Sequence, residues 1–300
     1  MLKETAPVKQ KGQALILVIV LLATVLTVGI SVATRSVINL RDTRNQQESQ
    51  KAYAAAETGV EKTLLQLNSG IPISAINCTS PCINLSNNAL VSSINVVQYP
   101  FGSSSNDPYN GNFALNDGNY LQQDRGADIW FVAHKTGGSV SVPDFNSGTW
   151  NGSITLDFQT PNSTFVNCDN TYPALALIVV YQGASGMETK RYTYDQCNSV
   201  RGNGFSQGTK STAPLSSDYN WATDPITITN GYFMHVTPLY SSTKVAVKYT
   251  SASGYKFPQQ GNLIDSTGSS GDTNRKIEVF QGYPQIPSEF YYGLLAPINN

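Results

Sequence analysis

The sequence predicts an α+β protein in which one long N-terminal helix packs on a mostly antiparallel β head domain. Three observations support this fold class. The stretch Ala14–Ala33 carries no charged residue, and Arg35–Leu67 contains one glycine and no proline. After about residue 70 the chain becomes rich in Ser, Thr, Asn, Gly and Tyr, a composition typical of short strands joined by turns.

The uncharged stretch Ala14–Ala33 is long enough to span a membrane, because a hydrocarbon core of about 30 Å needs roughly 20 helical residues. It is longer than the apolar part of a cleavable secretory signal, and no typical cleavage site follows it. Lys3, Lys9 and Lys11 precede it, which places the N-terminus in the cytoplasm and the bulk of the chain outside. We therefore expect a single-pass protein of the bacterial inner membrane.

The helix is predicted to continue well beyond the membrane. Apolar residues recur every three or four positions and form one stripe of a helix. These residues are Tyr53, Ala56, Val60, Leu64 and Leu67. The sequence NSGIP at 68–72 then ends the helix, so one helix of about 80 Å is expected over Gln13–Asn68. The predicted parts of the chain are thus a basic leader 1–12, a membrane half 13–34, an outer half 35–68, a linker and loop-rich region 69–125, and a β-rich head 126–300.

The predicted strands of the head are short and separated by turns. They are Asp128–Val132, Ser139–Val142, Ile154–Phe158, Ala174–Tyr181, Lys190–Tyr194, Ile226–Thr229, Tyr232–Val236, Lys244–Tyr249 and Lys276–Phe280. Between Ala174–Tyr181 and Lys190–Tyr194 lies a glycine-containing turn, which predicts a hairpin. The amphipathic end of the helix is expected to pack on an antiparallel sheet.

The four cysteines are expected to form two disulfides, because an even count in an exported chain favours oxidised pairs over free thiols. The midpoint between Cys168 and Cys197 falls in the turn of the predicted hairpin, so hairpin pairing brings these two sulfurs together. Cys78 and Cys82 then pair by elimination, in the loop CTSPC.

The N-terminal residues resemble the class III signal of type IV pilins and pseudopilins. The features that carry the resemblance are the basic leader with Lys9 and Lys11, Gly12 at its last position, and the apolar helix that follows. The resemblance implies that prepilin peptidase recognises this leader, cuts after Gly12 and methylates the new N-terminus, Gln13. It also implies assembly with other pilin or pseudopilin subunits on an inner-membrane platform, and a final place on a pilus at the cell surface.

The segment QESQKAYAAAETGVEKTL at 47–64 resembles the N-terminal domain of PilX-type minor pilins, in which an aromatic residue followed by A-A-E lies near the end of the first helix. Here these residues are Tyr53, Ala55, Ala56 and Glu57. The resemblance covers roughly residues 9–68. Roles in helix packing and assembly are expected for Leu17, Tyr53, Ala56, Glu57, Val60 and Leu64.

Leu17 departs from the pattern of major pilins, which carry a glutamate at the fifth mature position and usually an aromatic residue or methionine at the first. In the family this carboxylate is thought to pair with the N-terminal ammonium of a neighbouring subunit, and an unpaired charge in an apolar bundle costs several kcal/mol. PilX-type and tip-capping pseudopilin sequences also lack the acid. Leu17 therefore favours a minor subunit that primes or caps the fibre.

Two functional classes remain open on the sequence. The first is a minor pilin-like subunit of a pilus or a secretion pseudopilus. The second is an uncleaved, membrane-anchored β domain that acts as an adhesin with a surface or glycan ligand. The aromatic-rich stretch Pro284–Pro297 either docks on its own domain or is offered to a partner subunit. Formal net charge is -1 and charged residues make up 13% of the chain, so nucleic-acid binding is not expected.

Enzymatic chemistry and cofactors are not expected. The sequence GASGM around Ser185 is not G-x-S-x-G and lies in a predicted hairpin turn. The glycines of 202–208 follow no predicted strand, so they do not form a phosphate-binding loop.

No metal site is expected either. His134 and His235 have no metal-ligand spacing with cysteines or carboxylates. Asp265 and Asp272 bracket STGSSG and could hold calcium through oxygens, but a flexible surface loop is the favoured interpretation.

Overall fold

The computed structural model describes residues 13–85, 88–100, 112–135, 142–159, 168, 171–211, 218–251 and 257–285. Helix α1 runs over Gln13–Asn68 and packs on a mostly antiparallel sheet, so the predicted α+β fold class and the predicted end of the helix at Asn68 are confirmed. The leader, with Lys9, Lys11 and Gly12, lies outside the described residues.

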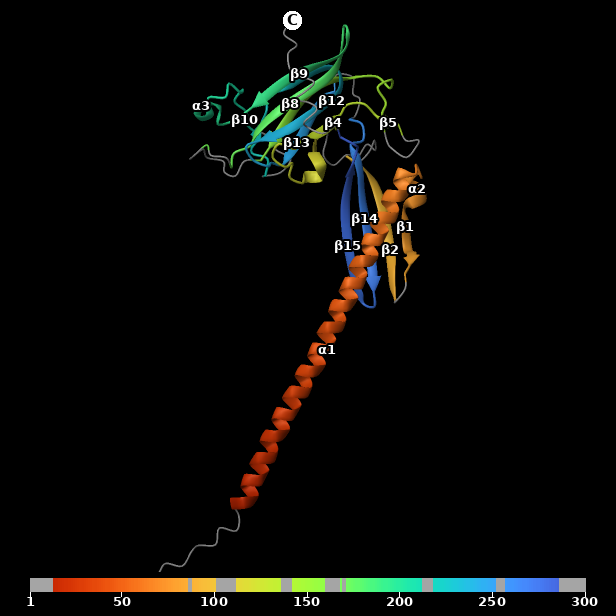
Figure 1. The fold of residues 1–300 in the computed structure, drawn as a ribbon, viewed down its shortest axis with the longest axis vertical. Coiled ribbons are helices and arrows are strands. Elements are labelled where there is room, and N and C mark those ends of the chain that lie inside the picture. Colours follow the sequence, from red (N-terminus) through yellow and green to blue (C-terminus); the bar gives the residue numbers. More distant parts are fainter. Residues whose placement is uncertain are drawn as a thin grey trace, which may run out of the picture.

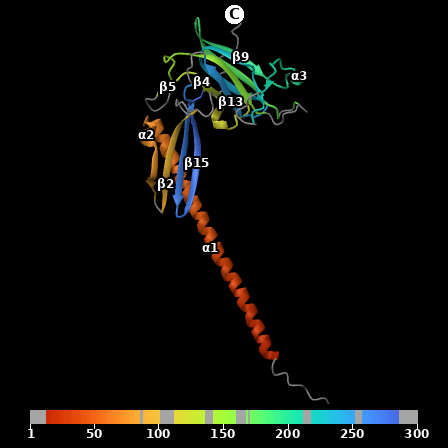
Figure 2. The ribbon, with the colours of Figure 1, turned by 180° about the vertical axis from the view of Figure 1, so that it is seen from behind.

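The outer end of α1 packs along one four-stranded antiparallel sheet, and we call this unit the sheet lobe (Figure 1). The strand order is β1 (Cys78–Asn84), β2 (Ala89–Tyr99), β14 (Gly261–Ser270) and β15 (Thr273–Gly282). The short helix α2 (Ile73–Ile76) connects α1 to β1. Figure 2, seen from behind, shows the same arrangement, with the sheet beside the outer end of α1.

A second unit, the head lobe, is inserted between β2 and β14 and lies beyond the outer end of α1 (Figures 1 and 2). Its nine-stranded sheet has the order β10-β11-β7-β12-β8-β9, with β13 paired to β3 and β7, and β4 paired to β12. The elements are β3 (Asn112–Ala114), η1 (Leu115–Gly118), β4 (Ala127–Trp130), β5 (His134–Lys135), β6 (Val142–Pro143), β7 (Trp150–Phe158), β8 (Ala174–Gly183), β9 (Gly186–Tyr194), α3 (Asn198–Arg201), β10 (Thr209–Lys210), β11 (Trp221–Ala222), β12 (Ile226–Leu239) and β13 (Val245–Ser251).

Most of the predicted strands are present, with several differences in extent. The hairpin of β8 and β9 is confirmed, and its two-residue turn at 184–185 includes Ser185. The predicted strands Ile226–Thr229 and Tyr232–Val236 form one strand, β12, which carries a register shift between Ile228 and Gly231 where it pairs with β7. Of Ser139–Val142, only Val142 is described.

Two expectations for the sheet lobe are wrong. Strands β1 and β2 lie inside residues 69–125, where the sequence predicts a linker and loops. Residues 266–270 belong to β14 rather than to a flexible loop, and only Gly271 and Asp272 form the turn. Strand β14 was not predicted because its residues are mostly small or polar, whereas strand propensity favours branched and aromatic side chains.

The two lobes have separate cores. The core of the head lobe is large and rich in aromatic residues, among them Phe113, Phe131, Trp150, Phe158 and Phe257. The core of the sheet lobe is smaller and mainly aliphatic. Its buried members are Val60, Ile76, Val91, Ile94, Val96 and Ile264.

Side-chain hydrogen bonds and one ring stack connect the two lobes where the chain passes from one to the other. The hydroxyl of Tyr99, the last residue of β2, donates to the carbonyl of Ala114 at 2.6 Å. The side-chain amide of Gln260 bonds to both backbone groups of Trp130, at 2.8 and 2.9 Å, as a neighbouring strand would. The ring of Tyr283 stacks on His134 at a centroid distance of 3.7 Å. These contacts fix the head lobe on the end of α1.

Candidate assembly site on the long helix

The inner half of α1 makes an exposed apolar surface. The large apolar side chains between Leu15 and Val32 are each more than half exposed, and the span is the one candidate for crossing a membrane among the described residues. An apolar helix surface of this size must be covered by lipid or by other helices. This half of the helix suggests a membrane anchor.

Leu17, at the predicted fifth mature position, lies in α1 and is 65% exposed. The roles of Lys9, Lys11, Gly12 and Gln13 in leader recognition, cleavage and methylation stay predictions.

The outer half of α1 docks on β14 through small residues. Ala52 and Ala56 are fully buried, and the backbone of Gly268 lies so close to them that a Cβ atom there would collide with the carbonyl of Ala52 and the amide of Ala56. A Cβ atom at Gly59 would collide in the same way with the hydroxyl of Ser266. The backbones of helix and strand can approach this closely only because both sides carry alanine, glycine or serine.

This geometry divides the residues of the A-A-E segment into two groups. Ala56 and Val60 are buried against the sheet and Leu64 is partly buried, as the predicted stripe requires. Tyr53 is 50% exposed, so its predicted place on that stripe is wrong. Glu57 is also exposed. The alanines thus pack within the chain, while Tyr53 and Glu57 are available to a neighbouring molecule.

Polar contacts pin the helix at the tip of the β14–β15 hairpin. Arg44 forms an ion pair with Glu48 at 3.1 Å, and the carboxylate of Glu48 lies against Gly271 of the turn. The guanidinium of Arg275 donates to the hydroxyl of Ser49 at 2.9 Å. These contacts set the point at which α1 leaves the sheet.

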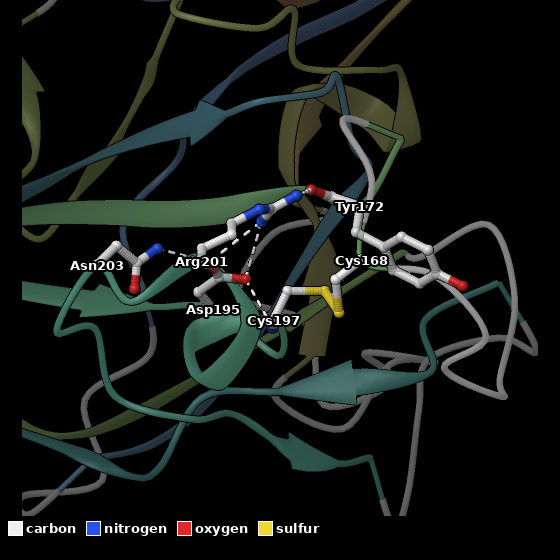
Figure 3. The surroundings of a disulfide bond; sticks show 6 residues. All are labelled: Cys168, Tyr172, Asp195, Cys197, Arg201 and Asn203. Atoms are coloured by element: carbon white, nitrogen blue, oxygen red, sulfur yellow. Dashed lines mark hydrogen bonds and ion pairs between the residues drawn. A yellow bond between two sulfur atoms is a disulfide. The ribbon is translucent and has the colours of Figure 1, made fainter.

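Both predicted disulfides are present in the structure, Cys78–Cys82 in the sheet lobe and Cys168–Cys197 in the head lobe. Beside Cys197, the buried carboxylate of Asp195 accepts bonds from Arg201 at 2.9 and 3.1 Å and from Asn203 at 2.6 Å (Figure 3). Arg201 also donates to the carbonyl of Tyr172 at 2.9 Å. Sequence reasoning missed this network, and the close spacing of an aspartate and an arginine around Cys197 was the available signal.

The two histidines have structural roles. Nδ1 of His235 lies 2.6 Å from Oδ1 of Asp128, and both side chains are buried. Burial lowers the pKa of His134 from its ordinary value to about 4. Among the described residues there is no group of three or more metal-ligating side chains.

The calcium interpretation is wrong. Asp265 lies within β14 and pairs with Lys276 at 2.9 Å, whereas Asp272 lies in the turn seven residues further along the hairpin. A strand rises about 3.3 Å per residue, so the two carboxylates are too far apart to share an ion.

The cavity between the lobes is too small for an organic ligand. It is lined by residues of both lobes, including Tyr99, Asp128, Trp130 and Gln260, and its volume is about 10 Å³. This is room for about one water molecule, whereas ligand sites usually have several hundred Å³. Ser185 is exposed in a hairpin turn and has no histidine near it in the sequence.

Residues 11–61 match the family described as PilX N-terminal. This match supports a PilX-type pilin N-terminal region over these residues. The match ends within α1, so it covers the apolar inner half and the helix side of the small-residue contact but none of the strands. Comparison with curated proteins and with solved structures gave no match. PilX-type pilins are structural, non-enzymatic proteins, and this PilX-type region suggests interaction with other pilus subunits.

Proposed function

We propose that this protein is a minor type IV pilin-like subunit that is cleaved after Gly12, methylated at Gln13 and assembled into a pilus or pseudopilus, which it primes or caps. The observation that carries the proposal is the PilX-type helix itself. Its outer half is docked on the sheet lobe, while its inner half touches no other part of the described chain.

The exposed inner half suits two environments in turn. In the membrane, lipid covers the apolar surface between Leu15 and Val32. In a fibre, the same surface packs against the helices of other subunits, which keep it out of water once it has left the lipid. The partners are therefore other pilin-like subunits, the prepilin peptidase and the assembly platform of the inner membrane.

Two features favour the tip of the fibre. Leu17 cannot neutralise the N-terminal ammonium of a neighbouring subunit, so it suits a position where there is no such neighbour. The head lobe projects beyond the outer end of α1 (Figure 1), into the space above this subunit. In the body of a fibre, the subunits assembled earlier would occupy the space into which this head lobe projects.

The test is the mature N-terminus. In cells with prepilin peptidase we expect mass spectrometry to find N-methylated Gln13 as the first residue, and the protein to be enriched in sheared pilus fractions. Gly12→Ala should abolish the shortening and the enrichment. Val200→Ala, a small change on an exposed side chain of α3 in the head lobe, is the control and should leave both the shortening and the enrichment intact.

The competing function is an uncleaved, membrane-anchored adhesin. This alternative predicts an intact Met1 end and no enrichment in sheared pilus fractions. That result, together with a Gly12→Ala protein of unchanged size and pilus association, would overturn the pilin proposal.

A further inference from the structure

Strand β9 lies at the edge of the head sheet. It pairs antiparallel with β8 along its whole length, and β8 is its one strand partner among the described residues (Figure 1). An edge strand offers unpaired backbone groups to another strand, so natural proteins usually cover or protect such edges.

The protein covers one end of this edge. Tyr194 forms a parallel bridge with Ser206, in which Ser206 N–H donates to the carbonyl of Thr193 at 3.0 Å and Asp195 N–H donates to the carbonyl of Ser206 at 2.8 Å. The covering segment follows Cys197 and is held by the disulfide and by the Asp195–Arg201 network (Figure 3). The cover starts at Thr193.

Within the part of the chain that the structure describes, no segment pairs with the remainder of the edge. Because the carbonyl of Thr193 points outward, strand alternation directs the N–H and C=O groups of Met187, Thr189 and Arg191 outward as well. Met187 is 56% exposed, and Thr189 and Arg191 are also exposed. Five residues of strand can therefore accept a partner strand.

We propose that β9 pairs antiparallel with β9 of a second copy of this chain, with Thr189 on the two-fold axis. In this register the outward groups of Met187 and Arg191 bond to those of Arg191 and Met187 in the second copy. The two Thr189 residues bond to each other, which gives about six backbone hydrogen bonds in total.

Charge selects this register. With Thr189 on the axis, Glu188 of each copy lies directly opposite Lys190 of the other, and opposite charges in such pairs are favourable. A shift of two residues in either direction keeps the hydrogen-bonding pattern but places Glu188 opposite Glu188, or Lys190 opposite Lys190. Like charges directly opposite are destabilising. The charges of Glu188 and Lys190 thus disfavour most other strands as partners but favour pairing of β9 with β9 of a second copy.

The side chains leave space for the second strand. Gly186 lies opposite Tyr192 of the other copy in this register, and a Cβ atom at Gly186 would meet no atom within 4 Å. Glu188 is held by the hydroxyl of Tyr181 at 2.9 Å, and Nζ of Lys190 lies 5.2 Å from the centre of the Tyr192 ring. Both charges are therefore already positioned on the same side of the sheet.

The first experiment measures self-association of the full chain in detergent by sedimentation velocity. We expect a monomer–dimer equilibrium that Thr189→Pro abolishes, because proline removes the outward N–H on the axis. The bonds from β9 to β8 come from the alternate residues and survive this change. Thr189→Val keeps the N–H and should dimerise like the wild type. An unchanged fluorescence spectrum of the head lobe shows that the proline variant is folded.

The second experiment exchanges the charges. Lys190→Glu places two glutamates opposite each other at both symmetric positions, and we expect dimerisation about tenfold weaker. Glu188→Lys should act in the same way, and the double variant with both changes should restore the wild-type affinity. Lys62→Glu, an equal change of charge at an exposed position of α1, should have no effect.

If the wild-type chain stays monomeric at the highest concentration measured, the proposal is wrong. This holds whether the edge of β9 is then unpaired or paired with another segment of the chain. A dimer that tolerates Thr189→Pro, or a double charge variant that fails to recover, also overturns it. None of these measurements depends on cleavage after Gly12, so their outcome is independent of the proposed pilin function.

Discussion

The sheet lobe and the head lobe are built on different packing principles. In the sheet lobe, α1 meets β14 through Ala52, Ala56, Gly59 and Gly268, so that the two backbones are almost in contact. In the head lobe, large aromatic and aliphatic side chains fill the space around the nine-stranded sheet. The first contact depends on the absence of side-chain volume, and the second depends on its presence.

This difference indicates what each lobe contributes. A close contact between small residues holds the helix in one position and orientation relative to the sheet. A large self-contained core lets the inserted head fold by its own contacts. All three tryptophans, Trp130, Trp150 and Trp221, belong to strands of the head lobe, so their fluorescence reports mainly on that lobe, with Trp130 also next to the junction.

The largest effect is expected from a cavity in the head core. Phe158→Ala removes a fully buried ring from β7 and should cost about 3–5 kcal/mol of head-lobe stability. Urea denaturation followed by tryptophan fluorescence measures this cost. Phe145→Ala is the control, since Phe145 is 37% exposed and its loss should change the midpoint far less. Equal shifts for the two variants would contradict the assigned core.

The second-largest effect is expected from removing the disulfides, each of which should destabilise only the lobe that contains it. Cys168 and Cys197 are 29 residues apart, so replacing both with serine should cost the head lobe about 3.5 kcal/mol by the loop-entropy estimate. The four-residue separation of Cys78 and Cys82 gives about 2 kcal/mol, confined to the sheet lobe. The fluorescence midpoint should therefore move only for the first pair, and a shift for the second would show that the lobes unfold together.

A smaller effect is expected at the helix–sheet contact. Gly268→Val forces side-chain volume between β14 and α1 and should cost about 1–3 kcal/mol. Hydrogen exchange of α1 over residues 48–67 should then accelerate, while tryptophan fluorescence stays unchanged. Ser269→Val, the neighbouring position of the same strand and only partly buried, should leave the helix protected. Exchange that is equally slow in both variants would contradict the close contact.

The last effect is expected from acid and is confined to the junction between the lobes. The pKa of His134 is lowered by burial to about 4, below its ordinary value of 6.5. The unfolded chain therefore binds the proton first, and stability of the junction should fall as the pH drops from 6.5 towards 4. In His134→Phe, which keeps an aromatic ring against Tyr283, the part of the pH dependence due to His134 should vanish. Unfolding midpoints at pH 7 and pH 4 give the comparison, and identical pH slopes for both proteins would show that His134 does not contribute.

The predictability of the fold differs between the helix and the strands for a physical reason. The continuation of α1 to Asn68, the β8–β9 hairpin and both disulfide pairings follow from local signals, namely uninterrupted helix formers, a glycine turn and cysteine spacing. Strand β14 gave no such signal, because its residues are small to fit beneath the helix. The position of Tyr53 was predicted wrongly for a related reason, since the buried side of α1 follows the alanines rather than the largest apolar residues.

The sequence by itself determined the membrane half, the long helix, the resemblance of its N-terminal region to PilX-type pilins and the cysteine pairs, because each depends on residues close together in the chain. Only the tertiary structure decided that the head is an insertion between β2 and β14, that Ala52 and Gly268 meet, and that among the described residues β9 pairs with β8 alone up to its cover at Thr193. Those facts depend on contacts between residues far apart in sequence, which local patterns do not encode.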